Sequence, residues 1–252
     1  SSVIGCDLEA AVENEFGPDD SPDGRPGCRV LAFAFSRKAL EAAVSRRVGQ
    51  SVLTCPTTAC YNGLNAAPDE SIGVGALLRS FGDGFQVSKK IADRRLWRIP
   101  VMDGEFVCED KVGTTKAVAG GNLILVADSP EACLAAAETA VAAMQDVSNT
   151  VLPFPGGIVR SGSKVCSRYP KLKASTNDAW CPTLRAQTES QLGERAACVY
   201  EIVIDGLDTQ SVQQSMRAGL HVAAGCSGLL RISAGNYGGK LGPHHFHLKD
   251  LL

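Results

Sequence analysis

Residues 197–233, ACVYEIVIDGLDTQSVQQSMRAGLHVAAGCSGLLRIS, contain one complete strand–helix–strand unit. Apolar residues dominate 197–205 and 228–233, as in strands that are buried on both faces. Between these strands, Asp208 is placed to cap a helix with an apolar stripe, and Gly225 is placed to end it. The stretch therefore predicts a helix that packs on a sheet.

The same order of strand, capped helix and strand occurs in residues 122–153. Residues 122–127 (NLILVA) form an apolar strand, and Ser129-Pro130-Glu131 is a typical helix start. Residues 150–153 form the return strand. Joined end to end, the two units give the β-α-β-β-α-β order of a ferredoxin-like fold. We therefore predict a four-stranded antiparallel sheet in residues 112–252, with two helices on one face.

The N-terminal part repeats only the second half of this pattern. Its expected elements are strands at 2–6, 28–35 and 51–55, a helix at 38–48 and a hairpin at 96–108. The sequence thus predicts an α+β fold of two ferredoxin-like lobes, residues 1–111 and 112–252, the first without its leading strand and helix. Because the leading strand of such a unit lies inside the sheet, we expect the native polypeptide to carry one more β-α unit before Ser1.

Composition excludes several classes of function. The 252 residues carry a formal net charge of -2, which gives no reason to expect binding to nucleic acid or to an anionic membrane. The apolar runs are too short to span a bilayer, and the first residues do not resemble a signal peptide. A cytoplasmic protein is therefore expected.

The ten cysteines include no Cys-x-x-Cys pair, and most lie within apolar strand or helix patterns. Buried, reduced thiols are the expected state. The cluster His244-His245-Phe246-His247 has no nearby cysteine or carboxylate to complete a tetrahedral set of ligands, so no metal site is predicted.

Glu201 is the one charged residue in the middle of an otherwise apolar strand. A carboxylate removed from water without a partner raises its pKa, and such groups collect at sites that transfer protons. Glu201 is therefore a candidate general acid or base. The alternative is a glutamate at a sheet edge that pairs with an arginine, and position alone does not separate the two.

Several predicted strands run into glycine-rich or polar corners, at 119–122, 154–157 and 235–242. Backbone without Cβ atoms can approach a ligand and present N–H groups to an oxyanion or phosphate. None of these corners matches the phosphate loop or the G-x-G-x-x-G turn. Each alone is equally typical of an ordinary turn.

The motifs together are far more specific than any one of them. They are PDGRPG (22–27), FGDG (81–84), AGGN (119–122), PFPGGIV (153–159), STNDAWCP (175–182), VYEIVI (199–204) and ISAGNYGGKLG (232–242). In this order they cover nearly the whole chain, which resembles the formylmethanofuran:tetrahydromethanopterin formyltransferase family.

The resemblance implies an enzyme that moves a formyl group between the amine of methanofuran and N5 of tetrahydromethanopterin, without a metal or a bound prosthetic group. It also implies that Glu201 lies at the reaction centre. Candidate substrate-binding residues are Gly120, Gly121, Asn122, Phe154, Gly156, Gly157, Ser175, Thr176, Asn177, Asp178, Gly235, Asn236, Gly238, Gly239 and Lys240. With Lys240, Arg160 and Lys164 are candidates for the acidic tails of the substrates, or else ordinary surface charges.

Our mechanistic hypothesis is that Glu201 takes the proton from the attacking nitrogen and returns it to the leaving one, while backbone N–H groups bind the oxyanion. We expect an oligomer, either of identical chains or with other subunits of a bacterial formyltransferase/hydrolase complex. The alternatives are a mainly architectural subunit of that complex and a ferredoxin-like RNA-binding module. The balance of 25 basic and 27 acidic residues disfavours RNA binding.

Overall fold

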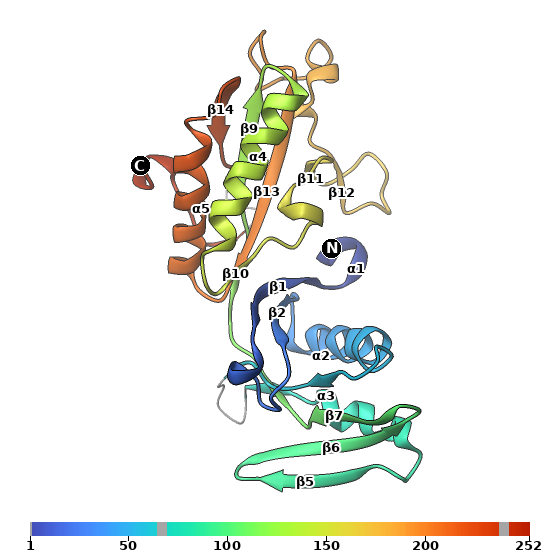
Figure 1. Ribbon diagram of the computed structural model, residues 1–252. Coiled ribbons are helices and arrows are strands. Elements are labelled where there is room, and N and C mark those ends of the chain that lie inside the picture. Colours follow the sequence, from blue (N-terminus) through green and yellow to red (C-terminus); the bar gives the residue numbers. More distant parts are fainter. Residues whose placement is uncertain (1, 65–69, 237–241) are drawn as a thin grey trace. The chain divides into compact units, whose positions relative to one another are not determined.

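The computed structural model describes residues 2–64, 70–236 and 242–252 (Figure 1). The chain divides into two compact units. The N-terminal unit comprises Ser2–Glu9 and Asn14–Lys116, and the C-terminal unit comprises Ala10–Glu13 and Ala117–Leu252. The predicted domain boundary after residue 111 stays a prediction. Within the described ranges, no helix combines the length and apolar character needed to cross a membrane.

The C-terminal unit contains one four-stranded antiparallel sheet, in the order β10-β13-β9-β14. This is the strand order of a ferredoxin-like fold, with the first and third strands inside, and it confirms the prediction for this part of the chain. The elements are β9 (Val118–Ala127), α4 (Pro130–Gln145), β10 (Thr150–Val151), β13 (Cys198–Gly206), α5 (Thr209–Ala223) and β14 (Leu229–Ser233).

Both helices begin at the predicted capping residues. The side chain of Ser129 accepts from Ala132 N at the start of α4, and Asp208 accepts from Ser211 N at 2.7 Å at the start of α5. The Ser211 hydroxyl also donates to Asp208 at 2.9 Å. These bonds satisfy N–H groups that have no partner inside the helix.

Replacing Asp208 with Ala is expected to lower the free energy of unfolding of the C-terminal unit by about 1 kcal/mol, because both bonds to Ser211 are lost. Urea denaturation checks this. Asp208→Asn retains an acceptor oxygen and is expected to unfold close to the wild-type midpoint. Equal midpoints for Asp208→Ala and Asp208→Asn would show that the cap contributes nothing.

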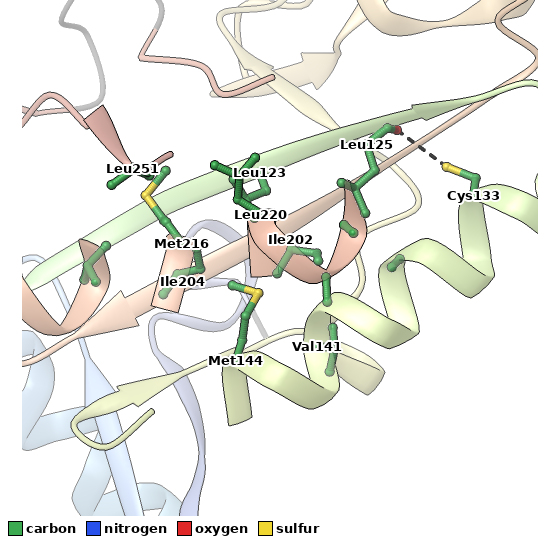
Figure 2. Close-up of a cluster of buried hydrophobic side chains, with 14 of the residues drawn as sticks. Leu123, Leu125, Cys133, Val141, Met144, Ile202, Ile204, Met216, Leu220 and Leu251 are labelled. Carbon is green, nitrogen blue, oxygen red and sulfur yellow. Dashed lines mark hydrogen bonds between the residues drawn. The ribbon is translucent and has the colours of Figure 1, made fainter. Parts of the chain in front are cut away.

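Both helices pack against the same face of the sheet, where apolar side chains from four elements meet (Figure 2). Leucine and isoleucine side chains from the two central strands meet methionines from the helices. The labelled residues of this cluster include Leu123, Leu125, Met144, Ile202, Ile204 and Met216. Alternation places Glu201 on the opposite face of β13.

The opposite face of this sheet is covered by the chain between β11 (Ser163–Val165) and β13. Leu192 and Ala196 bury Ile124 and Val126 of β9, and Trp180 packs against the same cluster. The sheet is therefore covered on both faces, as the apolar runs in its strands predict.

The N-terminal unit has a different sheet, in the order β3-β7-β6-β5, where β3 and β7 are parallel and the other pairs antiparallel. The predicted hairpin at 96–108 is confirmed as β6 and β7. The elements up to residue 116 are α1 (Val3–Cys6), β1 (Glu9–Phe16), η1 (Pro18–Asp20), β2 (Gly27–Phe33), α2 (Arg37–Arg47), η2 (Val48–Val52), β3 (Ala59–Cys60), β4 (Ser71–Ile72), α3 (Val74–Leu78), η3 (Arg79–Gly82), β5 (Val87–Ile91), β6 (Arg94–Val101), β7 (Gly104–Glu109) and β8 (Val112–Gly113). Residues Ala10–Glu13 of β1 belong to the C-terminal unit.

The predicted strand at 2–6 is wrong, because these residues form the short helix α1. Ser2 caps it by accepting from Ile4 N at 3.2 Å, and Asp7 ends it with a φ of 62°. The first strand therefore begins only at Glu9. A Ser before a short apolar run is compatible with a helix start, and this local bond decides between the two structures.

The predicted strand at 51–55 is also wrong. Helix α2 continues into the π-helical turn η2, and Leu53 N donates to Val48 O at 2.8 Å. Val48, Val52 and Leu53 pack into the core beside Trp97 and Phe106 from this helical turn. A short apolar run does not distinguish a strand from a buried helix. Two elements on which the prediction of a second ferredoxin-like lobe rests are therefore wrong, whereas the α+β class is confirmed.

Candidate functional site

Glu201 lies in the middle of β13, with its backbone paired on both sides. On one side it is opposite Ile124 of β9. On the other side, Glu201 N donates to Val159 O at 3.0 Å and Val159 N donates to Glu201 O at 2.7 Å. Glu201 is therefore not at a free sheet edge, and the alternative of an edge glutamate paired with arginine is wrong.

The motif at 153–159 explains this pairing. Residues Pro155–Gly157 form a 3-10 turn, η4, in which Gly157 N donates to Phe154 O at 2.8 Å. The turn directs the chain back so that Val159 lies beside β13. Sequence reasoning singled out the glycines of this motif but missed Val159, whose backbone fixes the position of Glu201.

The side chain of Glu201 is hydrogen-bonded to Asn122 of β9. Asn122 Nδ2 donates to Glu201 Oε1 at 3.3 Å, and also to Gly235 O at 3.1 Å. Gly235 N in turn donates to Asn122 Oδ1 at 2.8 Å. Three segments far apart in the sequence thus meet at one buried amide.

This environment changes the acidity of Glu201. Burial raises the pKa of Glu201 to about 7, and the N–H of Asn122 partly opposes that rise by stabilising the ionised form. A carboxyl with a pKa near neutrality is populated in both the acidic and the basic form at the pH of a cell. Glu201 can therefore accept and return a proton.

The raised pKa of Glu201 has a consequence for stability. The folded protein keeps a proton on this carboxyl up to about pH 7, whereas the unfolded chain loses it near the ordinary value of 4.5. The folded state therefore binds more protons in this window, so stability falls as the pH rises through it. Glu201→Gln mimics the protonated acid and is expected to be more stable than the wild type by about 3 kcal/mol at pH 8, with little difference at pH 4.5.

Urea denaturation at several pH values measures this difference. Glu194→Gln is the matched control, because Glu194 is an exposed carboxylate in the same unit. A gain for Glu201→Gln that does not change between pH 4.5 and pH 8, or no gain at pH 8, would contradict the raised pKa.

Two of the candidate glycines lie on the helix-covered face instead of beside the Glu201 carboxylate. A Cβ at Gly121 would lie 2.7 Å from Val212 Cγ1 on α5, and a Cβ at Gly157 would lie 2.9 Å from Val141 Cγ2 on α4. Real Cβ atoms do not come so close. Close packing of the helices therefore explains why glycine is needed at both positions.

Three backbone N–H groups of the glycine corners already have partners. Gly120 N donates to Asp205 Oδ1 at 2.9 Å, and the N–H groups of Gly157 and Gly235 donate to Phe154 O and Asn122 Oδ1. These three groups are therefore not available to bind an oxyanion in this conformation.

The 175–182 motif forms the end of the hairpin β11 and β12 (Ala174–Thr176) and the turn η5 (Asp178–Trp180). Ser175 Oγ donates to Cys166 O at 2.8 Å, Thr176 is exposed and Asn177 is buried. Trp180 brings this turn onto the sheet face that carries Glu201.

The predicted cationic residues differ in their surroundings. Lys164 Nζ lies 2.5 Å from Asp178 Oδ1, so this ammonium pairs with a carboxylate of the chain itself. The pKa of Asp178 is lowered by that bond. Arg160 follows Val159 and is exposed. Lys240, Gly238 and Gly239 lie outside the described residues.

Asn236, Phe154 and Gly156 complete the set of candidates. Asn236 Nδ2 donates to His244 O at 3.0 Å, which joins the segment after β14 to the histidine cluster. Phe154 is partly buried and precedes the turn η4, in which Gly156 has a φ of 60°. The structure thus brings Asn122 and Gly235 to Glu201 through side-chain bonds, and the 153–159 motif through its backbone.

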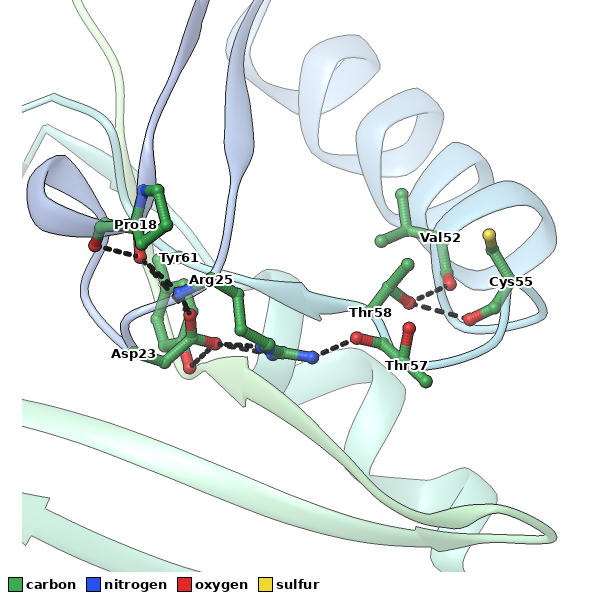
Figure 3. A network of polar contacts seen from close by, with 9 residues as sticks. Pro18, Asp23, Arg25, Val52, Cys55, Thr57, Thr58 and Tyr61 are labelled. Atoms are coloured by element: carbon green, nitrogen blue, oxygen red, sulfur yellow. Dashed lines mark hydrogen bonds and ion pairs between the residues drawn. The ribbon is translucent and has the colours of Figure 1, made fainter.

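The PDGRPG motif of the N-terminal unit forms a separate polar network (Figure 3). The Arg25 guanidinium pairs with Asp23 and donates to Thr57 O, and the Tyr61 hydroxyl donates to Asp23 Oδ2 at 3.0 Å. Arg25 and Thr57 also line a pocket of about 230 Å³ that includes Asp103. The arginine is engaged within the chain, so the motif ties the loop at 55–61 to residues 22–27.

The described residues contain neither a metal-ligand cluster nor a disulfide. No group of three or more His, Cys, Asp or Glu side chains is arranged there to hold a metal ion. The ten cysteines carry free thiols, but only Cys108 and Cys133 are buried, so the expectation of burial is wrong for the others.

Comparison with known proteins identifies the family. Residues 1–101 match the family model described as formylmethanofuran-tetrahydromethanopterin formyltransferase, and residues 104–251 match that of its proximal lobe. A formylmethanofuran–tetrahydromethanopterin formyltransferase of Methylococcus capsulatus is 52% identical over 255 residues, which span 100% of this chain and 85% of the relative. A protein of Methylorubrum extorquens, named as one of the subunits of a formyltransferase/hydrolase complex, is 50% identical over 261 residues, spanning 100% of this chain and 83% of the relative.

Two solved structures from the same family resemble this chain. The crystal structure of the formyltransferase/hydrolase complex from Methylorubrum extorquens, in complex with methylofuran, contains a chain with a TM-score of 0.94 and 50% identity, covering 99% of this chain and 83% of that chain. The formyltransferase of Methanosarcina barkeri has a TM-score of 0.90 and 43% identity, covering 100% of this chain and 85% of that chain. This chain therefore belongs to the formylmethanofuran–tetrahydromethanopterin formyltransferase family.

Proposed function

We propose that this chain transfers a formyl group between the amine of methanofuran and N5 of tetrahydromethanopterin, and that Glu201 moves the proton. Membership of the family supports the reaction. The burial of the Glu201 side chain supports its role. The carboxyl lies on a strand inside the sheet, and burial raises its pKa to about 7.

Each step balances without a metal or a redox partner. The lone pair of the attacking nitrogen forms a bond to the formyl carbon, and the C=O π pair moves onto oxygen. Ionised Glu201 takes the proton from that nitrogen. The oxygen pair then re-forms the C=O bond, the bond to the leaving nitrogen breaks, and the proton passes from Glu201 to that nitrogen. The carboxylate is regenerated.

The oxyanion needs donors that are free in the folded chain. Since the N–H groups of Gly120, Gly157 and Gly235 are engaged, we assign these residues to shaping the corners of the site. Phe154, Gly156 and the exposed Thr176 are the described candidates for substrate contacts to which the bonds above assign no partner side chain. Arg160 is the remaining described cation among those assigned to the acidic tails.

We also propose that the chain works in the cytoplasm within an oligomer. The relative from Methylorubrum extorquens is named as a subunit of a formyltransferase/hydrolase complex, which supports a hetero-complex. In such a complex this chain would supply the transfer step. A purely architectural subunit would need neither a carboxyl with a pKa near 7 nor the amide that is bonded to it.

The direct test is to incubate the purified protein with formylmethanofuran and tetrahydromethanopterin and to follow N5-formyl-tetrahydromethanopterin by mass spectrometry. We expect formation of that product, and formation of formylmethanofuran in the reverse direction. A folded protein that makes neither, alone or in the complex purified from its own cells, would leave only the architectural role.

A further inference from the structure

Asn122 is the one described side chain that lowers the pKa of Glu201, and its geometry is unusually well defined. It lies two residues before Ile124, the residue paired with Glu201, and it is 5% exposed. Asn122 therefore reaches the carboxylate diagonally across the two central strands on the face away from the helices.

The orientation of the Asn122 amide is fixed by backbone groups. Gly235 N donates to Oδ1 at 2.8 Å, so a flipped amide would set an NH₂ group against this N–H. With Oδ1 toward Gly235 N, the two Nδ2 hydrogens go to Gly235 O at 3.1 Å and to Glu201 Oε1 at 3.3 Å. Both donors of the amide are thus used inside the chain.

We propose that Asn122 is a positioning residue, which holds the carboxylate of Glu201 in place through its bonds to the backbone of Gly235, and that it does not bind substrate. This inference rests on the proposed function and revises the substrate-binding role that the AGGN motif suggests. The amide has no donor left for a substrate, whereas it faces the one group to which the mechanism assigns a proton.

The amide also sets the acidity of Glu201. An N–H donor stabilises the ionised carboxyl and so opposes the effect of burial. Strands β9 and β10 carry no titratable side chain. The other packed elements carry further titratable and charged groups, namely Cys198, Tyr200 and Asp205 on β13, Arg231 on β14, Glu131, Cys133 and Glu138 on α4, Arg217 and His221 on α5, Arg160 after η4, and Lys164, Cys166, Arg168, Tyr169, Lys171, Lys173, Asp178, Cys181, Arg185, Glu189, Glu194 and Arg195 from β11 to the start of β13. Burial and Asn122 are the causes that act on the pKa of Glu201.

The test combines two variants with one control. Asn122→Ala removes the donor, and Asn122→Asp keeps an acceptor for Gly235 N but places a second carboxyl beside Glu201. Asn62→Ala is the matched control in the N-terminal unit, because Asn62 also bridges backbone groups through its amide, accepting from Gly113 N at 2.7 Å. If Asn122→Ala fails to fold, Asn122→Asp still carries the test.

The first readout is the pH profile of kcat and KM for formyl transfer. In Asn122→Ala we expect the acidic limb to move up by about one pH unit, with kcat recovering at high pH and KM changed less than about twofold. In Asn122→Asp the new carboxyl and that of Glu201 should titrate in two coupled steps. The midpoint of the step at higher pH should lie above the single midpoint of the wild type. Asn62→Ala should not change the midpoint of the pH profile. A KM raised many-fold with an unmoved midpoint, or a loss of kcat that is equal at every pH, would overturn the inference.

The second readout does not depend on activity. Infrared titration, with Glu201→Gln as the blank, follows protonation of the Glu201 carboxyl directly. We expect its midpoint to rise in Asn122→Ala, and an unchanged midpoint would overturn the inference. If Glu201→Gln turned out to be fully active, the proposed function of Glu201 would fail, while a raised infrared midpoint would still show that Asn122 holds and tunes this carboxylate.

Discussion

Glu201→Gln is expected to lower kcat for formyl transfer by about 10²- to 10⁴-fold at pH 8, with the chain still folded. The amide keeps the shape of the side chain but cannot take the proton from the attacking nitrogen. The size follows from what a positioned acid or base typically contributes to a reaction. Steady-state formation of N5-formyl-tetrahydromethanopterin, with both substrates at saturation, measures it.

Two comparisons make this result specific. Glu194→Gln removes an exposed carboxylate of the same unit and should retain wild-type kcat. The stability gain expected for Glu201→Gln at pH 8 shows independently that loss of activity is not loss of fold. Wild-type kcat in folded Glu201→Gln would remove Glu201 from the mechanism.

Gly75→Ala is expected to destabilise the N-terminal unit by about 3 kcal/mol. A Cβ on Gly75, near the start of α3, would lie 2.4 Å from Glu109 O and 3.0 Å from Asp110 Cα. These are backbone atoms at the end of β7, which cannot rotate away. Either α3 or the end of β7 must therefore move, together with the bond from Ala76 N to Asp110 O.

Fluorescence provides a local measurement, because Trp97 is buried in the core of the N-terminal unit and Trp180 lies in the C-terminal unit. In a Trp180→Phe background, the urea midpoint of Trp97 should fall in Gly75→Ala. Gly5→Ala is the control, since nothing lies within 4 Å of a Cβ at that helical position. Its midpoint should be unchanged or slightly higher. Equal midpoints for the two variants would contradict this account of Gly75.

The C-terminal unit was predictable from the sequence because its local and long-range signals agree. Ser129 and Asp208 are strong capping residues, and each is followed by a stripe of apolar residues at helical spacing. The strands before the two helices, β9 and β13, are long enough for their type to be clear. When secondary-structure propensity, capping residues and apolar spacing all predict the same element, tertiary packing is consistent with that element.

In the N-terminal unit these signals conflict. The short apolar runs at 2–6 and 51–55 have no alternation long enough to separate strand from helix. At residues 2–6, the cap at Ser2 favours a helix over a strand. At residues 51–55, the helix continues because Val52 and Leu53 are then packed against the core. Neither contact can be read from propensity.

The candidate site also has one part that the sequence predicts and another that only the folded structure reveals. A single carboxylate in an apolar strand was enough to predict Glu201 and its altered acidity. The partners of that carboxylate could not be predicted, because Asn122 and Gly235 are 113 positions apart and meet only after the sheet has formed. Val159 contributes only its backbone, so its side chain carries no signal at all.

The measurement that tests the central claim most directly is the pH dependence of kcat/KM for formyl transfer by the wild-type protein. This ratio reports the ionisation of essential groups in the free enzyme. We expect kcat/KM to rise with pH through a single midpoint near 7, the pKa of Glu201, and we expect this limb to be absent from the residual activity of Glu201→Gln. A profile that is flat from about pH 5.5 to 8, or an identical limb in Glu201→Gln, would contradict this expectation.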